Sequence, residues 1–191
     1  MTEGRPLDGI VVADLSRVLA GPTAAMMLAD LGARVIKVER PGSGDDTRHW
    51  GPPWIRGGPA EAASSYFESA NRGKQSIALD FGAADDLRIA RAVVDRADIV
   101  IENYRAGALE RYGLDAASVA ERNPRAVYVS ITGFGSGAGA DLPGYDFLVQ
   151  AVGGLMSITG EPDGEPMKVG VAVVDLLAGK DAVMGALAAL L

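Results

Sequence analysis

The feature that most constrains the fold is a strand–helix–strand pattern near the start of the chain. Residues 9–14 form a short run rich in Val and Ile, residues 22–31 have the Ala, Met and Leu content of a helix, and residues 33–39 return to a β-branched run. Gly32 stands where glycine commonly follows the end of a helix. Because two strands joined by a helix pair in parallel with a right-handed crossover, this pattern predicts a βαβ unit.

The same alternation continues along the chain. Residues 76–80, 99–102 and 126–131 are further strand candidates, and residues 84–97 have a helical pattern before the second of these. Repeated alternation of this kind predicts an α/β fold, a Rossmann-like and mostly parallel sheet with helices on both faces. The length suits a single domain with one core, which we assign to residues 1–191.

Three segments interrupt the pattern. Residues Arg40 to Ala63 are rich in Gly, Pro and Trp without periodicity, which predicts a long loop, and long loops in compact domains are commonly functional. Gly133 to Pro143 is a second, glycine-rich loop. Leu148 to Met156 reads as a helix broken at Gly153-Gly154.

Composition excludes several classes of function. The chain has no Cys, which removes disulfides, thiolate nucleophiles and thiolate metal sites, and no metal-binding motif stands out. The net charge of -7 disfavours nonspecific nucleic-acid binding. No window approaches the roughly 18 apolar residues of a membrane span, and residues 1–5 are not apolar like a secretory signal. We therefore expect a cytoplasmic protein without metal, nucleic-acid or membrane partners.

Asp175 is the leading candidate for chemistry. It follows the apolar run of residues 169–174, which predicts a buried strand, and it precedes a helical segment beginning near Leu176. An acid at the carboxyl end of such a strand would face the ligand edge of an open α/β sheet. The alternative is an N-cap that satisfies the first N–H groups of the helix, and position alone leaves both readings open.

Basic residues gather near the predicted strand ends, where they would suit phosphate groups, although a solvated surface is the simpler reading for any one of them. At the first strand-to-helix turn, Pro22 suits the first helical turn and Gly21 would let a ligand approach the backbone. No GxGxxG or Walker pattern is present. The basic residues are Arg17, Lys37, Arg40, Arg72, Lys74, Arg105 and Arg111.

Other nucleophilic arrangements find little support. His49 is the only histidine, so a Ser/His/Asp triad would have to include it, and no GxSxG pattern exists to supply the serine. Tyr145 and Asp146 end the second glycine loop and add a phenol and a second carboxylate. Their simpler roles would be packing for Tyr145 and helix capping for Asp146. Chemistry is thus expected from carboxylate, backbone and tyrosine groups.

Taken together, several motifs in this order resemble the N-terminal half of family III CoA-transferases. The resemblance extends over nearly the whole chain. It implies the fold of the N-terminal part of the large domain in that family. The matching segments are Asp14–Pro22, Leu31–Glu39, Asn71–Lys74, Glu102–Tyr104, Gly144–Asp146 and Val174–Asp175.

This resemblance implies an acyl-CoA:carboxylate CoA-transferase in which Asp175 is the nucleophile, with Tyr145 and Asp146 as further catalytic residues. The Asp175 carboxylate would attack the acyl-CoA thioester and form a mixed anhydride, and a second carboxylic acid would then take over CoA by attack on the anhydride and return of the thiolate. CoA thioester is thus a substrate, with no permanently bound cofactor. The resemblance implies a CoA site at Val18, Arg40, Lys74, Asn103, Tyr104 and Arg111.

Two alternatives remain at this stage. The same family includes α-methylacyl-CoA racemases, which place a histidine where this chain has Tyr145. Tyrosine is a poor base near neutral pH because its pKa is about 10, so transfer is favoured over racemisation. Asp146 fits both branches. A second alternative is a catalytically silent module that binds CoA or a partner protein.

The resemblance also bears on assembly. Family members are about twice as long as this chain and form interlocked homodimers. We therefore expect the 191 residues to lack the small domain and the loop that covers the nucleophile, and to have little turnover alone. Residues 182–191 are apolar on most faces, as expected of a helix that packs against further protein.

Overall fold

The computed structural model describes residues 4–55 and 63–191, and its centre is a five-stranded parallel sheet. The predicted loop over Arg40 to Ala63 falls partly on residues 56–62, and the predicted absence of a signal falls partly on residues 1–3; both ranges lie outside the described residues. The order of the strands is β5-β2-β1-β6-β7. Their bounds are β1 Val11–Asp14, β2 Arg34–Glu39, β5 Lys74–Ala78, β6 Ile99–Glu102 and β7 Val127–Ser130.

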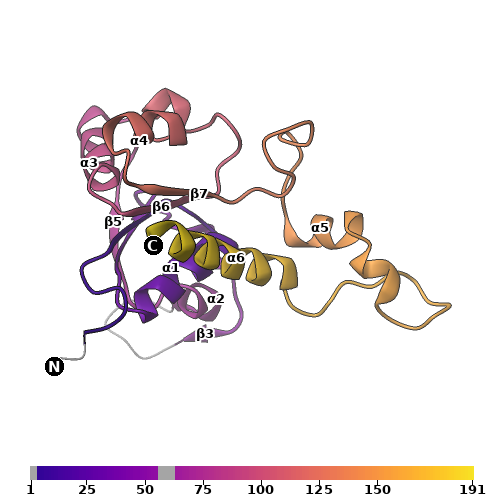
Figure 1. Ribbon diagram of the computed structural model, residues 1–191. Coiled ribbons are helices and arrows are strands. Elements are labelled where there is room, and N and C mark those ends of the chain that lie inside the picture. Colours follow the sequence, from indigo (N-terminus) through magenta and orange to yellow (C-terminus); the bar gives the residue numbers. More distant parts are fainter. Residues whose placement is uncertain (1–3, 56–62) are drawn as a thin grey trace.

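Helices cover both faces of this sheet, which confirms the predicted α/β class (Figure 1). Successive side chains of a strand point to opposite faces of the sheet and belong to two separate cores. Val12 packs with α1 and α6, whereas Ala13 packs with α3 and α4. Because both faces of the central strands β1 and β6 are buried, these two strands read as nearly continuous apolar runs. The covering helices are α1 Ala20–Asp30, α6 Val173–Leu190, α3 Ala84–Val94 and α4 Ala116–Arg122.

The chain changes direction across the sheet at β1. From β1 it passes outward to β2 and β5 on one side, and then returns to build β6 and β7 on the other. β1 therefore pairs with both β2 and β6, with Ala13 opposite Ile36 and Val100. Such a switch point leaves a crevice at the carboxyl ends of the two central strands, where ligands bind in open α/β sheets.

Shorter elements occupy the connections. The predicted loop after β2 contains a 3-10 helix, η1 Asp46–His49, and a two-stranded pairing of β3 Trp54–Ile55 with β4 Ala63–Ser64, followed by α2 Ser65–Ser69. The segment between β7 and α6 extends away from the sheet (orange in Figure 1) and contains α5 Asp146–Val152 and η3 Leu155–Ile158. Gly154, with a φ of +79°, separates these two helices at the predicted break. The remaining element is η2 Glu110–Tyr112.

The strand predicted before Asp175 is wrong. Residues 169–172 are irregular and only partly buried, and α6 already begins at Val173. The backbone of this segment bonds to a side chain and not to a neighbouring strand: Val169 N donates to Gln150 Oε1 at 2.9 Å. An apolar run alone cannot distinguish a strand from the start of a helix.

A close helix crossing fixes the position of α6. A Cβ at Gly179 would lie 2.8 Å from the Ala20 carbonyl oxygen, so only glycine lets α6 approach α1 this closely. Asp175 lies one turn before Gly179, and the crossing therefore places it above the first turn of α1. Within residues 4–55 and 63–191, none of the helices combines the length and hydropathy needed to cross a bilayer.

Candidate active site

A cavity of about 300 Å³ opens at the carboxyl ends of β1, β6 and β7, beside the first turn of α6. It lies at the switch point of the sheet. The structure brings six of the predicted site residues to its wall, from four different parts of the chain: Val18, Asn103, Tyr104, Tyr145, Asp146 and Asp175.

Asp175 is the third residue of α6, whose N-cap is Ala172. The N-cap alternative for Asp175 is therefore wrong, and the carboxylate lies in the cavity wall. Burial and the nearby negative charge of Asp146 raise the pKa of Asp175 to about 6. A carboxyl group with such a pKa in a cleft is a candidate for chemistry.

Asp146 caps α6 instead of its own helix. Its Oδ1 accepts hydrogen bonds from Val174 N at 2.8 Å and from Asp175 N at 3.4 Å. Asp146 is the first residue of α5, and Tyr145 occupies the N-cap position there without a side-chain cap bond. Asp146 thus fixes the backbone that carries Asp175, and its negative charge also raises the pKa of Asp175.

Gln150 supports this arrangement and was not singled out in the sequence. Its side chain is almost fully buried, and Nε2 donates to Asp146 Oδ2 at 2.6 Å while Oε1 accepts from Val169 N. Gln150 therefore ties α5 to the segment that leads into Asp175. The available signal was a lone amide in an apolar stretch, four residues after Asp146 and so on the same helix face.

The turn between β1 and α1 forms the opposite wall. Asn103, the residue after β6, holds this turn, because its Oδ1 accepts from Arg17 N at 2.9 Å and its Nδ2 donates to Arg17 O at 2.7 Å. Pro22 lies in the first turn of α1 as predicted. Gly21 lines neither cavity, and a Cβ there would collide with the Ser16 side chain, so packing within the turn already requires glycine at this position.

A smaller cavity of about 30 Å³ adjoins the first. The two share Arg17 and Tyr104, and Arg40 lines only the smaller one. The Arg17 guanidinium lies 5.5 Å from the centre of the Tyr104 ring. Arg105 also lines the larger cavity and Lys37 the smaller one, so four of the basic residues at strand ends lie around these two openings.

The other basic residues lie elsewhere. Lys74 Nζ is buried and donates to Asp14 Oδ2, Pro22 O and Asn71 Oδ1 at 2.8–2.9 Å, which uses its three N–H donors. Burial lowers the pKa of Lys74 to about 8. Arg111 is exposed in η2 with its guanidinium over Tyr112. Neither side chain lines the two cavities as the structure stands.

Tyr66 is a further residue that the sequence did not indicate. Its pKa is raised by burial and then by the charges of Asp175 and Asp146, so its phenol lies within electrostatic reach of both carboxylates. The ring packs edge-on against Trp50, with 5.2 Å between ring centres. Its position only five residues before the Asn71–Lys74 motif was the available signal.

The fold and the cavity define a doubly wound α/β protein that has a cavity at the switch point and a carboxylate with a raised pKa in the cavity wall. The chain belongs to CoA-transferase family III, whose sequence profile matches residues 7–191.

Named relatives and a solved structure agree with this membership. The chain is 52% identical to the succinate–glutarate CoA-transferase of Agrobacterium fabrum over 97% of its own length and 47% of that protein. It is 47% identical to the mouse (Mus musculus) succinyl-CoA:glutarate CoA-transferase over 92% and 39% of the respective lengths. A CAIB/BAIF family protein from Brucella suis superimposes with a TM-score of 0.94 at 49% identity, covering 98% of this chain and 50% of that one. The chain thus spans half or less of these relatives.

Proposed function

We propose that this chain supplies the acyl-accepting aspartate and the CoA-binding cleft of an acyl-CoA:carboxylate CoA-transferase. The observation that carries the proposal is the Asp175 carboxylate in the wall of the cavity at the switch point. With a pKa of about 6, it is largely ionised at neutral pH and still more basic than an ordinary aspartate. Such a carboxylate can act as a nucleophile toward a thioester.

In the first step, an Asp175 oxygen attacks the thioester carbonyl carbon. A C–O bond forms, the C–S bond breaks, and the electron pair leaves with sulfur as CoA thiolate. The product is an aspartyl-acyl mixed anhydride. The acceptor carboxylate then attacks the aspartyl carbonyl carbon of this anhydride. A new C–O bond forms, the bond from that carbon to the donor acid breaks, and the donor leaves as its carboxylate, so that the acceptor is now joined to Asp175 as a mixed anhydride. Return of the thiolate to the acceptor's carbonyl carbon then regenerates the Asp175 carboxylate.

Negative charge develops on oxygen and sulfur in these steps, and the first turn of α1 is placed to stabilise it. Leu19 and Ala20 line the cavity, and α1 has no side-chain cap at its N-cap position. The first N–H groups of a helix lack intrahelical partners and carry the positive end of the helix dipole. They therefore suit an oxyanion or a thiolate.

For CoA itself we propose contacts with Val18, Asn103 and Tyr104 in the larger cavity and with Arg40 in the smaller one. Arg17 and Arg105 add positive charge at the same openings. Lys74 contributes indirectly, because its donors hold β5 and α1 together behind the turn. Arg111 would need additional chain around the site to contact CoA.

For the acyl groups we propose dicarboxylic acids. The names of the two reported relatives specify succinyl or succinate and glutarate groups. A second carboxylate on the substrate would be attracted to the cationic side chains of Arg17 and Arg105.

Mass spectrometry of the chain after addition of succinyl-CoA tests the proposal. We expect a succinyl adduct that hydroxylamine removes, because an acyl anhydride is highly electrophilic. Asp175→Ala should abolish the adduct. Asp181→Ala, on an exposed position of the same helix, should retain it. An adduct that persists in Asp175→Ala would contradict an aspartyl intermediate. Absence of the adduct from the unaltered chain would contradict acyl acceptance by these 191 residues alone.

A further inference from the structure

The turn from Ser16 to Val18 has a backbone conformation that its sequence disfavours. Val18 has a φ of +71°, the left-handed region, and is the only non-glycine residue with positive φ among those the structure describes. A β-branched side chain rarely adopts this conformation. Such residues persist only where the surrounding structure holds them, and they concentrate at functional sites. Val18 lines the larger cavity.

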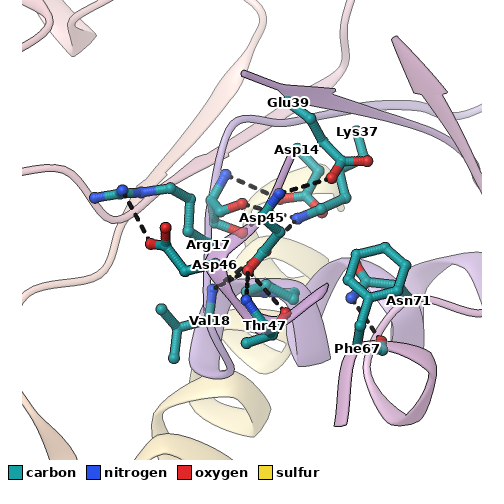
Figure 2. A network of polar contacts seen from close by, with 12 residues as sticks. Asp14, Arg17, Val18, Lys37, Glu39, Asp45, Asp46, Thr47, Phe67 and Asn71 are labelled. Carbon is teal, nitrogen blue, oxygen red and sulfur yellow. Dashed lines mark hydrogen bonds and ion pairs between the residues drawn. The ribbon is translucent and has the colours of Figure 1, made fainter. Parts of the chain in front are cut away.

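Buried side chains satisfy the backbone of this turn group by group. Lys37 Nζ donates to Ser16 O at 3.0 Å, and Asp14 Oδ1 accepts from Ser16 N at 3.0 Å. Asn103 holds both backbone groups of Arg17, as described above. Both carboxylate oxygens of Asp45 accept from Val18 N at 3.3 Å (Figure 2).

Asp45 is itself held from several directions. Its side chain is fully buried and forms an ion pair of 3.0 Å with Lys37, which is equally buried. Its Oδ1 also accepts from Thr47 N and Thr47 Oγ1, and its own N–H donates to Glu39 Oε2 at 2.9 Å. A buried carboxylate needs this degree of pairing. The network joins the loop after β2 to the turn after β1.

The helical hydrogen bonds of α1 do not hold Val18 in its conformation. The first helical hydrogen bond of α1 runs from Thr23 N to the carbonyl of the N-cap residue Leu19, and Pro22 has no N–H that could donate to the Val18 carbonyl, four residues earlier. The first turn of α1 therefore does little to fix Val18. Groups on the side of the turn away from α1 therefore constrain the backbone of Val18, and Asp45 is the residue that accepts the hydrogen bond from Val18 N–H.

We propose that Asp45, neutralised by Lys37, is a positioning residue that holds Val18 in the left-handed conformation in which this turn can contact the CoA thioester. The inference rests on the proposed function, since CoA is the ligand it concerns. Asp45 acts through Val18 and touches no reacting atom.

Nuclear magnetic resonance tests the conformational part without any ligand. With positive φ, the amide proton and Hα of Val18 lie close together, so the unaltered chain should give a strong intraresidue HN–Hα cross-peak for Val18. Asp45→Asn places an amide nitrogen against either Lys37 or Thr47 and should weaken this cross-peak. A weak cross-peak in the unaltered chain, or an unchanged one in a folded Asp45→Asn variant, would overturn the inference.

CoA binding measured by calorimetry tests the consequence through a double-mutant cycle. Glycine adopts positive φ readily, so a chain with Val18→Gly needs Asp45 less. Asp45→Asn should raise the Kd for CoA about tenfold, equivalent to about 1.4 kcal/mol, in the Val18 chain and no more than about threefold in the Val18→Gly chain. An equal loss in both chains would show that Asp45 acts independently of Val18 and would overturn the inference.

Asp98→Asn is the matched control. Asp98 also accepts a backbone N–H, from Val11 at 2.8 Å, but it precedes β6 and so lies at the amino ends of the strands, away from the cavity at their carboxyl ends. It should leave both the Kd and the Val18 cross-peak unchanged. If the unaltered chain binds no CoA, the proposed function fails, while the cross-peak comparison still decides whether Asp45 sets the conformation of Val18.

Discussion

At the scale of single residues, the two carboxylates of the cavity govern the expected pH dependence. Asp175 must be ionised to attack a thioester, and burial beside Asp146 raises its pKa to about 6. The rate of aspartyl acylation should therefore rise with pH, with a midpoint near 6, and level off above it. Quenched single-turnover reactions with succinyl-CoA, analysed by mass spectrometry across this range, would measure the midpoint.

Asp146→Asn separates the two causes of that pKa. The amide oxygen can still cap Val174 N, although the amide nitrogen cannot accept the hydrogen bond from Gln150 Nε2. Because the negative charge is lost, the midpoint should move to lower pH by up to roughly one unit. Asp163→Asn, in the exposed loop before α6, should not move it. A midpoint unchanged in Asp146→Asn would mean that burial alone sets the pKa.

Asp175 illustrates how far residue-level prediction reached. Its position after an apolar run singled it out correctly for the cavity wall, although the run is not a strand and Asp175 is not an N-cap. Gln150 and Asp45 could not be found in this way. Their roles depend on partners 19 and 27 residues distant in sequence, which only the fold brings close.

At the scale of elements, Lys74 joins three parts of the fold. It begins β5, forms a 2.8 Å ion pair with Asp14 at the end of β1, and donates to the Pro22 carbonyl in α1. Lys74→Met would leave the fully buried Asp14 with Lys37 alone, at 4.0 Å. We expect a loss of about 3 kcal/mol in the free energy of unfolding, since an uncompensated buried charge is costly.

Urea unfolding followed by circular dichroism would measure this loss. Arg72→Met is the matched control, because Arg72 lies two residues earlier and its ion pair with Asp30 is exposed. Exposed pairs contribute little, so the control should lose less than about 1 kcal/mol. Equal losses in the two variants would argue against a structural role for Lys74.

The elements themselves were predicted best where periodicity and helix-ending residues agreed. The first βαβ unit is confirmed, including Gly32 with positive φ after α1. The strand expected at residues 76–80 is shifted to Lys74–Ala78, because pairing with β2 sets its register. The loop after β2 gained short elements that its Gly and Pro content concealed, since their stability comes from contacts such as those of Asp45.

At the scale of the whole molecule, the parallel sheet follows from the alternation of strands and helices, whereas the order of its strands and the shape of the cavity do not. The cavity depends on how the segment between β7 and α6 folds back to place Asp146 at α6. One device there is local: a Cβ on Gly133 or Gly144 would collide with the backbone of the other, so these glycines close the base of the loop. The glycine-rich pattern predicted a loop but not this contact.

The same segment and α6 leave apolar side chains at the surface, which bears on assembly. Leu177 and Met184 on α6 are 53% and 60% exposed, and Phe147 and Val152 on α5 are also exposed. A cluster of this kind favours burial against more protein. Following the family resemblance, we propose a homodimer that covers it. Light scattering should then give twice 19.7 kDa at micromolar concentrations.

Charge introduced into the covered surface tests that proposal. Leu177→Glu combined with Met184→Glu removes two apolar contacts and would bury two unpaired carboxylates, so dimerisation should weaken by at least about tenfold. Lys180→Gln, between them on the same helix and also exposed, should leave the mass unchanged. Asp175 lies near the first turn of α6, so acylation can also be measured on the monomeric variant. Acylation that persists would mean that the partner only covers α6, and acylation that is lost would mean that the partner completes the cavity. A monomeric mass for the unaltered chain would contradict the proposed dimer for these 191 residues.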